Sequence, residues 1–348
     1  MTTTNFLDRN EFNYLPSQKV VDALKNFNAN TLCFYTRIYD EGKKSIFSEF
    51  LAERYGIPES QVLLGYGGED ILKQAVHFFL TQEDGNKTIL IPSLSWWYYK
   101  SIADEVNGKT LQYPIIEEGN TFRYDKEGFK AMIGKENPKV VLIASPNNPT
   151  GNSLTPGEIE EMLSFIPHSA QVLIDEAYAS FISSDSSYIK TLISKYPNII
   201  VIRTLSKFYG LPGLRMGFGF ISKEQEQFSG YCNKYLGYNR ISEDIAIAAL
   251  QSEEYYRGIA GKMNEDREAY EQELGALPGF IVYKSAANFI LIKYPVELKS
   301  ALKEAFSKVS YKLKFMDEPN INEHLRITLG RQEQNRKVID MIKQIALS

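Results

Sequence analysis

The stretch TLSKFYGLPGLRMGFG, residues 204–219, carries a single lysine among glycines, aromatic residues and a proline. Lys207 is followed by Phe208 and Tyr209, and Arg215 comes eight residues later. Surface lysines usually have polar neighbours, so these apolar neighbours indicate that Lys207 is enclosed. An enclosed lysine either loses its proton or forms a covalent bond, and both are starting points for chemistry.

Around this stretch, short apolar runs alternate with helical patterns. The runs are apolar throughout, as in strands buried on both faces. They are TILIP (88–92), VVLIAS (140–145), QVLID (171–175), NIIVIRT (198–204) and FGFIS (218–222). Between them, residues 71–80 carry an apolar stripe of helical period, and Thr155 before Pro156 predicts a helix start. The alternation predicts an α/β fold with a doubly wound, mostly parallel sheet.

The pattern changes after about residue 240. Residues 241–274 read as one long or bent helix, interrupted by little except Gly258 and Gly261. An α+β section follows, with strands predicted at 288–294, 312–317 and 324–330 and a helix at the end of the chain.

Composition limits the classes of protein. The 348 residues suffice for two domains, and 39 basic against 43 acidic residues, a net charge of −4, argue against a general affinity for nucleic acid. Two distant cysteines, Cys33 and Cys232, exclude a disulfide framework and fit a reducing compartment. The N-terminus does not read as a signal peptide, and no apolar run is long enough for a membrane span. We therefore expect a soluble, cytoplasmic protein without membrane or nucleic-acid partners.

Polar and aromatic residues follow the apolar runs, and in an open α/β sheet ligands bind where the parallel strands end. The residues that follow the runs are Trp96, Trp97, Asn148, Asp175, Tyr178, Ser206 and Lys207. Each has a plain structural explanation: PNNPTG (146–151) could be only a turn, Asp175 a helix cap, and Lys207 a snorkelling side chain. Independent accidents would not all fall at one edge of the sheet, so we expect a site there.

The stretch GYGGED (65–70), with Gly68 and Glu69, precedes an amphipathic helix and is a weak sequence signal for a phosphate site. Glycines at a helix start let backbone N–H groups approach an anion. The motif lacks the final glycine of the dinucleotide fingerprint, and the chain has no P-loop. The histidines, His77, His168 and His324, lack the spacing of metal ligands.

Together these groups suit pyridoxal 5'-phosphate (PLP), which needs an amine, a carboxylate at its ring nitrogen, a donor at its ring oxygen, a stacking partner and a phosphate cup. The candidates are Lys207 for the aldehyde, Asp175 for the ring nitrogen, Tyr178 with Asn148 for the ring oxygen, Trp97 for stacking, and Gly68, Glu69, Ser206 and Arg215 for the phosphate.

The chain then resembles the class I/II (fold type I) PLP-dependent aminotransferases, and most closely the histidinol-phosphate aminotransferase group. The matching motifs are SPNNPTGN (145–152), LIDEAYASF (173–181), TLSKFYGLPGLRMGFG (204–219), ANFILIK (287–293) and HLRITLG (324–330). The resemblance implies a large PLP-binding domain over residues 35–245. It implies a small domain built from residues 1–34 and 246–348, with an N-terminal lid segment.

The same resemblance implies roles for single residues. Lys207 would be the Schiff-base lysine and proton shuttle, and Asp175 would stay ionised beside the ring cation, which lowers its pKa. Arg326 matches the arginine that binds the substrate carboxylate. Tyr39 aligns with a tyrosine that reaches the partner subunit's phosphate, which implies a homodimer with shared sites, although DEGKKS replaces the relatives' proline-rich segment after it.

Two further matches are looser. Tyr14, in NEFNY (10–14), matches a lid residue that touches substrate, together with Arg326 and Asn148. A second C-terminal arginine of the histidinol-phosphate enzymes falls near Arg336 or Lys337.

The resulting prediction is an aminotransferase that moves an amino group from histidinol phosphate, or next an aromatic amino acid, to a 2-oxo acid such as 2-oxoglutarate. The alternative is a PLP-dependent enzyme like threonine-phosphate decarboxylase, because the sequence does not show which substrate bond breaks. A regulator that binds PLP without catalysis is a third reading, disfavoured because no basic helix-turn-helix segment is present.

Overall fold

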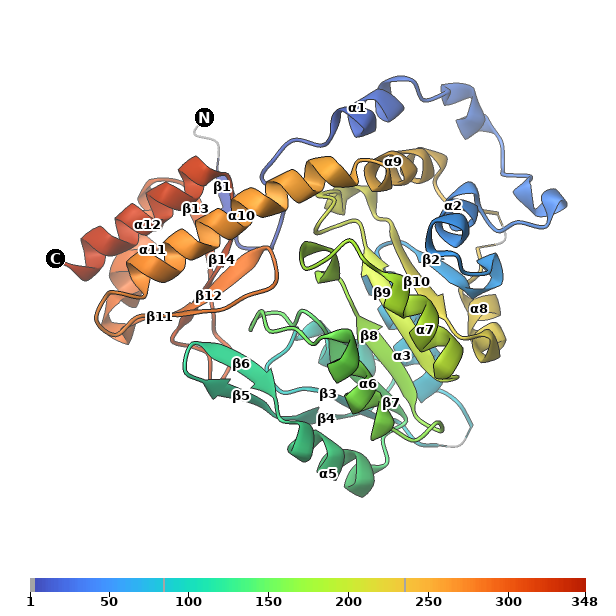
Figure 1. Ribbon diagram of the computed structural model, residues 1–348, viewed down its shortest axis with the longest axis horizontal. Helices are drawn as coiled ribbons and strands as arrows, with labels where there is room; N and C mark the ends of the chain where they lie inside the picture. The colour runs from blue at the N-terminus through green and yellow to red at the C-terminus, as the bar shows by residue number, and fades with distance from the viewer. Residues whose placement is uncertain (1–3, 84, 235) are drawn as a thin grey trace.

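The computed structural model describes residues 4–83, 85–234 and 236–348. Two β-sheets form the framework, a large one near the middle of Figure 1 and a smaller one near the chain termini. The α/β fold expected from the sequence is confirmed.

The large sheet has the strand order β2-β10-β9-β8-β7-β3-β4. Neighbouring strands are parallel except β10, which is antiparallel to β2 and β9. The strands are β2 (Val62–Gly65), β3 (Thr88–Pro92), β4 (Lys109–Tyr113), β7 (Val140–Ala144), β8 (Gln171–Asp175), β9 (Ile199–Thr204) and β10 (Gly217–Ile221). The five predicted strands of this sheet are present within one residue of their predicted ends.

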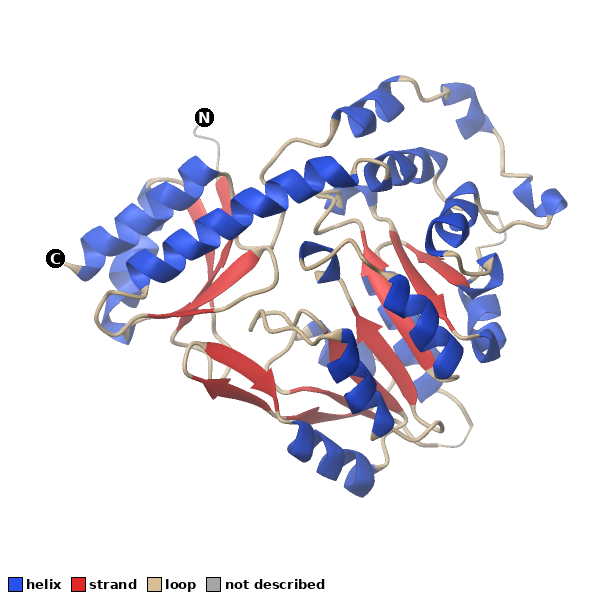
Figure 2. Ribbon diagram, viewed as in Figure 1, coloured by secondary structure: helices blue, strands red, loops and turns tan. Residues whose placement is uncertain are grey.

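Helices cover both faces of the large sheet, which explains why its strands are apolar throughout. Figure 2 shows helices on either side of this sheet. In β7, Leu142 packs on the side of α3 (Gly68–Leu80), whereas Val141 packs on the side of α6 (Pro156–Ser164) and α7 (Ser187–Lys195). One face carries α3 (Gly68–Leu80), α4 (Tyr98–Asp104) and α8 (Glu226–Cys232). The other carries α2 (Ile46–Tyr55), α5 (Lys126–Glu136), α6 (Pro156–Ser164), α7 (Ser187–Lys195) and α9 (Arg240–Leu250). Thr155 caps α6 through a capping box, as its sequence predicts.

The smaller sheet joins the two ends of the chain, with the order β1-β13-β14-β12-β11. Its first strand comes from the N-terminus and pairs in parallel with β13. The strands are β1 (Asn5–Leu7), β11 (Ile281–Tyr283), β12 (Phe289–Lys293), β13 (Tyr311–Phe315) and β14 (His324–Thr328), with the helices α10 (Glu253–Leu274), α11 (Lys299–Lys308) and α12 (Gln332–Ala346) packed beside them. The predicted domain boundaries at residues 35 and 245 stay a prediction.

The remaining elements are short. A hairpin joins β5 (Ile115–Glu118) to β6 (Thr121–Tyr124), and α1 (Gln18–Lys25) packs against α9. Short 3-10 helices are η1 (Ala29–Cys33), η2 (Ile38–Glu41), η3 (Glu59–Gln61), η4 (Ala179–Phe181), η5 (Pro212–Leu214), η6 (Lys223–Gln225) and η7 (Val296–Leu298).

One prediction about the helices was wrong. Residues 241–274 form two helices, and the break lies between Leu250 and Glu253 rather than at the glycines. At the break, the Ser252 hydroxyl donates to the carbonyl of Ala248 and accepts from the Ser17 hydroxyl, at 2.7 and 2.8 Å. This serine thus ties the N-terminal segment to the junction of α9 and α10. Across the described parts of the chain, no helix is both long and apolar enough to cross a bilayer.

Candidate active site

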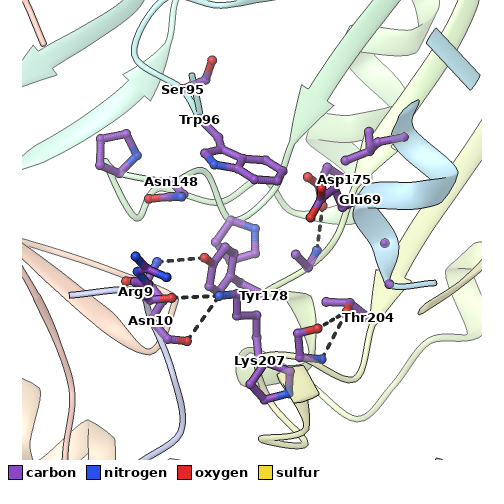
Figure 3. A pocket seen from close by; sticks show the side chains of 18 of the residues that line it. Arg9, Asn10, Glu69, Ser95, Trp96, Asn148, Asp175, Tyr178, Thr204 and Lys207 are labelled. Carbon is purple, nitrogen blue, oxygen red and sulfur yellow. Dashed lines mark hydrogen bonds between the residues drawn. The ribbon is translucent and has the colours of Figure 1, made fainter. Parts of the chain in front are cut away.

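A cavity of about 820 Å³ lies at the carboxyl ends of β7, β8 and β9. Its lining combines loops of the large sheet with residues 8–11 and with β13 and β14 of the small sheet (Figure 3). The predicted site residues that line it are Gly68, Glu69, Trp97, Asn148, Asp175, Tyr178, Ser206, Lys207, Arg215 and Arg326. The fold thus brings together residues from Gly68 to Arg326, as ligand sites of open α/β sheets require.

Lys207 follows β9 and directs its amine into the cavity (Figure 3). Its Nζ donates to the backbone carbonyl of Arg9 at 3.0 Å and to that of Asn10 at 3.4 Å. Burial, followed by the charge of Arg326, lowers the pKa of Lys207 to about 8. A larger share of this amine is therefore neutral at physiological pH than for an exposed lysine, and the neutral amine is the nucleophile.

Asp175 ends β8 and is 7% exposed. Its carboxylate accepts the Tyr99 hydroxyl at 2.6 Å and the Ala177 backbone N–H at 3.0 Å. In the chain alone burial raises the pKa of Asp175, and these two hydrogen bonds oppose the rise. The lowering expected from the sequence requires the cation of a cofactor ring, which the chain itself does not supply.

Tyr178 and Asn148 both lie near Arg326. The Tyr178 hydroxyl accepts from Asn10 Nδ2 at 2.8 Å, and burial raises the pKa of Tyr178 to about 12. Arg326 donates to Asn148 Oδ1 and, at 2.6 Å, to the carbonyl of Asp8. The Nε of Arg326 is buried without a hydrogen-bond partner among the described residues, so this guanidinium retains a free donor.

Glycines shape the opposite end of the cavity, at the N-terminus of α3. Gly67 has a φ of 89°, and a Cβ there would lie 2.7 Å from Arg215 Nη2. A Cβ on Gly217 would lie 2.3 Å from the peptide bond of residues 67–68. The buried Ser206 hydroxyl adds a polar group. Backbone N–H groups, a hydroxyl and a guanidinium form a cradle of the kind that binds phosphate.

The tryptophans of the loop after β3 differ in position. Trp97 is 64% exposed and lines the cavity, and its ring meets Tyr98 edge-on. Trp96 is more buried, packs against Tyr98 and Tyr99, and turns its indole into the cavity in Figure 3. Either indole is near enough to the cavity to stack on a ring, so the assignment of stacking to Trp97 stays a prediction.

Four residues singled out from the sequence are not among those that line this cavity. Tyr14 packs beside Phe12, against the apolar cluster of the small sheet. The Tyr39 hydroxyl donates to the carbonyl of Lys234. On α12, Arg336 forms ion pairs with Glu273 and Asp340, and Lys337 lies over the ring of Tyr311. Neither of the two residues proposed as a second substrate cation lines the cavity.

Sequence reasoning missed three residues of the site. Tyr99 bonds Asp175, Asn10 bonds Tyr178, and Lys314 lines the cavity from β13. A signal existed for Asn10, which opens the NEFNY segment, and for Lys314, which alternates with the apolar residues Leu313 and Phe315 in a predicted strand. None existed for Tyr99, one aromatic residue in WWYY (96–99).

The residues present fit PLP. A nucleophilic amine, a buried carboxylate, a phenol with an amide, and a phosphate cradle line one cavity of suitable size. Among the described residues, no group of His, Cys, Asp and Glu is arranged to hold a metal ion.

Comparisons with known proteins agree with this geometry. The profile of the family "Aminotransferase class I and II" matches residues 5–342. Histidinol-phosphate aminotransferase of Ruminiclostridium cellulolyticum is 30% identical over 308 residues, 88% of this chain and 84% of that protein.

Two solved structures share the fold at lower identity. Histidinol-phosphate aminotransferase from Sinorhizobium meliloti, in complex with PLP, superimposes with a TM-score of 0.86 at 21% identity, covering 99% of this chain and 91% of that one. L-threonine-O-3-phosphate decarboxylase from Porphyromonas gingivalis gives 0.79 at 18% identity, covering 99% and 100%. The chain therefore belongs to the class I and II aminotransferases, and it is a PLP-dependent transaminase of fold type I, like the histidinol-phosphate aminotransferases.

Proposed function

We propose that the protein transfers an amino group from a donor with an anionic tail to a 2-oxo acid such as 2-oxoglutarate. Histidinol phosphate is the leading donor and an aromatic amino acid the next. The observation that carries this proposal is the pair of cations, Arg326 and Lys314, on neighbouring strands of the cavity wall.

The register of the small sheet supports this reading. Lys314 on β13 and Arg326 on β14 are directly opposed Cα partners, so both side chains leave the same face of the sheet, and both line the cavity. Arg326 is largely buried, whereas Lys314 is partly exposed and has no carboxylate within 4.0 Å among the described residues. Two adjacent cations suit a substrate with two anionic groups. They also suit two substrates that bind in turn, each with one anionic tail, in the two half-reactions.

The other side chains then have the following roles. PLP supplies an aldehyde that bonds to amines and a ring that withdraws electrons from the bond that breaks. Lys207 provides the amine and carries a proton to and from the substrate Cα. Asp175, held by Tyr99, keeps the ring nitrogen protonated, while Tyr178 and Asn148 bind the ring oxygen. Ser206, Arg215 and the N-terminus of α3 bind the phosphate.

The proposal includes a cytoplasmic homodimer. Tyr39 lies outside the cavity of its own chain, as a residue serving the partner's site would. Both cysteines are unpaired, as in a reducing compartment. Exposed apolar side chains gather in the segment that precedes Tyr39, where they suit an interface between subunits. Those side chains are Leu32, Phe34 and Tyr35. Mixing inactive Lys207→Ala chains with Tyr39→Phe chains tests for shared sites, because a mixed dimer would regain one intact site.

The decisive experiment measures amino transfer for each candidate donor in the wild type and in Lys314→Gln. We expect the KM for histidinol phosphate to rise about 10-fold or more, the size of a lost hydrogen bond to a charged group. The KM for an aromatic amine that carries no anionic group should change little. Lys308→Gln, an exposed lysine on α11 with the same change in charge, is the control.

Two results would contradict this function. An unchanged KM for the phosphorylated donor in Lys314→Gln would mean that the anionic tail does not bind at Lys314. Release of carbon dioxide from a phosphorylated amino acid, without any need for a 2-oxo acid, would replace transamination by the decarboxylase alternative.

A further inference from the structure

Asn10 lies at the junction of the N-terminal segment, the small sheet and the cavity. It is 1% exposed and has a left-handed backbone with φ of 56°, a conformation that asparagine tolerates better than most residues. Its backbone N–H donates to Thr328 Oγ1 at 2.9 Å, and its carbonyl accepts from Asn288 Nδ2 at 3.1 Å. These backbone contacts fasten residues 8–11 to the small sheet.

The side chain of Asn10 makes a different contact. Its Nδ2 donates to the Tyr178 hydroxyl at 2.8 Å, and the two residues meet beside Lys207 (Figure 3). The other end of the amide accepts from the Thr328 hydroxyl at 3.4 Å, which fixes the amide with its NH₂ group toward Tyr178. Holding the segment in place requires the backbone contacts, but it does not require this donor to face a phenol in the cavity.

The direction of this hydrogen bond has a chemical consequence. A phenol has one hydrogen, and an amide NH₂ group can only donate. Because Tyr178 accepts from Asn10, its own hydrogen remains available for an acceptor inside the cavity. A hydroxyl that accepts one hydrogen bond also becomes a stronger donor in the next. In agreement, the bond from Asn10 works against burial by lowering the pKa of Tyr178, after the larger effect of Arg326.

We propose that Asn10 is a positioning residue for Tyr178, whose amide holds the hydroxyl so that its hydrogen points at the ring oxygen of PLP. This rests on the proposed role of Tyr178. The hydrogen bond from Tyr178 stabilises negative charge on that oxygen, which then attracts the proton on the nitrogen of Lys207 less strongly. Asn10 therefore lowers the pH at which the Lys207 nitrogen loses its proton in the holoenzyme.

The experiment is a pH titration of the visible absorption band of the holoenzyme. The main variant is Asn10→Gly, because glycine keeps the left-handed backbone without strain while it removes the amide. We expect the midpoint of the titration to rise by about half a unit, the size that one neutral hydrogen bond transmits. Tyr178→Phe should raise it further. In Tyr178→Phe, adding Asn10→Gly should change nothing, because the amide then has no hydroxyl to position.

Asn288→Ala is the matched control, since it removes the side-chain donor to the Asn10 backbone carbonyl and leaves the Asn10 amide, Thr328 and Tyr178 in place. It should lower the melting temperature of the apoprotein without moving the band's midpoint. A second variant, Asn10→Asp, keeps the side-chain shape but only accepts when ionised. The negative charge of Asn10→Asp shifts the midpoint by itself, and this shift is measured by making the same substitution in Tyr178→Phe. Subtracting it from the shift in the wild-type background leaves the effect of the lost hydrogen bond. The charged groups that face Lys207 are the same in all the other variants, namely Glu11, Asp175, Arg215 and Arg326.

The outcomes separate this proposal from the function on which it rests. An unmoved midpoint in Asn10→Gly, or an equal rise with and without the Tyr178 hydroxyl, overturns the role of Asn10 while the transaminase stands. An unmoved midpoint in Tyr178→Phe overturns both the role of Tyr178 and that of Asn10. A wild type that forms no visible band with PLP overturns the proposed function itself.

Discussion

Tyr99 offers the sharpest test of the electrostatics of the site. It is 3% exposed, and its hydroxyl donates to the buried Asp175 carboxylate at 2.6 Å. In Tyr99→Phe the ring remains, but the carboxylate loses a hydrogen bond to a charged acceptor, worth about 1.5–3 kcal/mol. Without this hydrogen bond, burial raises the pKa of Asp175 further, so a smaller share of the carboxylate is charged and available to hold the cofactor ring. If the whole of this energy is lost from cofactor binding, the dissociation constant of PLP rises roughly 10- to 150-fold.

The assay is a spectral titration of apoprotein with PLP, alongside thermal unfolding. Tyr113→Phe is the matched control, because Tyr113 is also fully buried and its hydroxyl donates to a backbone carbonyl, that of Leu142, at 2.9 Å. Tyr113→Phe should lose about 1 kcal/mol of folding stability, and Tyr99→Phe should lose about 1.5–3 kcal/mol because its acceptor is charged. Cofactor affinity should fall in Tyr99→Phe and not in Tyr113→Phe. Equal affinities in the two variants would refute the idea that Tyr99 acts through Asp175.

Three further predictions concern other parts of the site. The rate at which apoprotein binds PLP covalently should rise with pH with a midpoint near pH 8, because the pKa of Lys207 is lowered to about 8. At pH 7 the neutral share of this amine exceeds that of an ordinary lysine roughly 300-fold, and a midpoint above 10 would contradict the enclosure of Lys207. In Arg326→Gln, loss of the neighbouring positive charge should move that midpoint upward and raise the KM for substrate carboxylates, measured in the same rapid-mixing and steady-state assays. Gly217→Ala places a methyl 2.3 Å from the peptide bond of residues 67–68, so the free energy of unfolding should fall by about 1–3 kcal/mol and PLP should bind more weakly, whereas Gly134→Ala, with nothing within 4 Å, should do neither.

Much of the large sheet was predictable because its strands are buried on both faces. A strand covered by helices on both sides must be apolar at every position, so runs such as 88–92 and 171–175 match their strands residue for residue. Local rules also placed the start of α6 at Thr155 and Pro156. The same rules could not place the break between α9 and α10, because it depends on Ser17 of a distant segment meeting Ser252.

Local sequence patterns were enough to predict the α/β class and the residues at the strand ends, because each of these depends on neighbours a few positions away. Lys207, Asp175 and Asn148 each follow an apolar run, and the ends of neighbouring strands must share an edge. The side chains that contact these residues became clear only from the folded chain. Tyr99 reaches Asp175 across 76 residues and Asn10 reaches Tyr178 across 168, while the strand register sets Lys314 beside Arg326. Contacts across such separations depend on how sheets and loops pack in space, and no local sequence pattern predicts this packing.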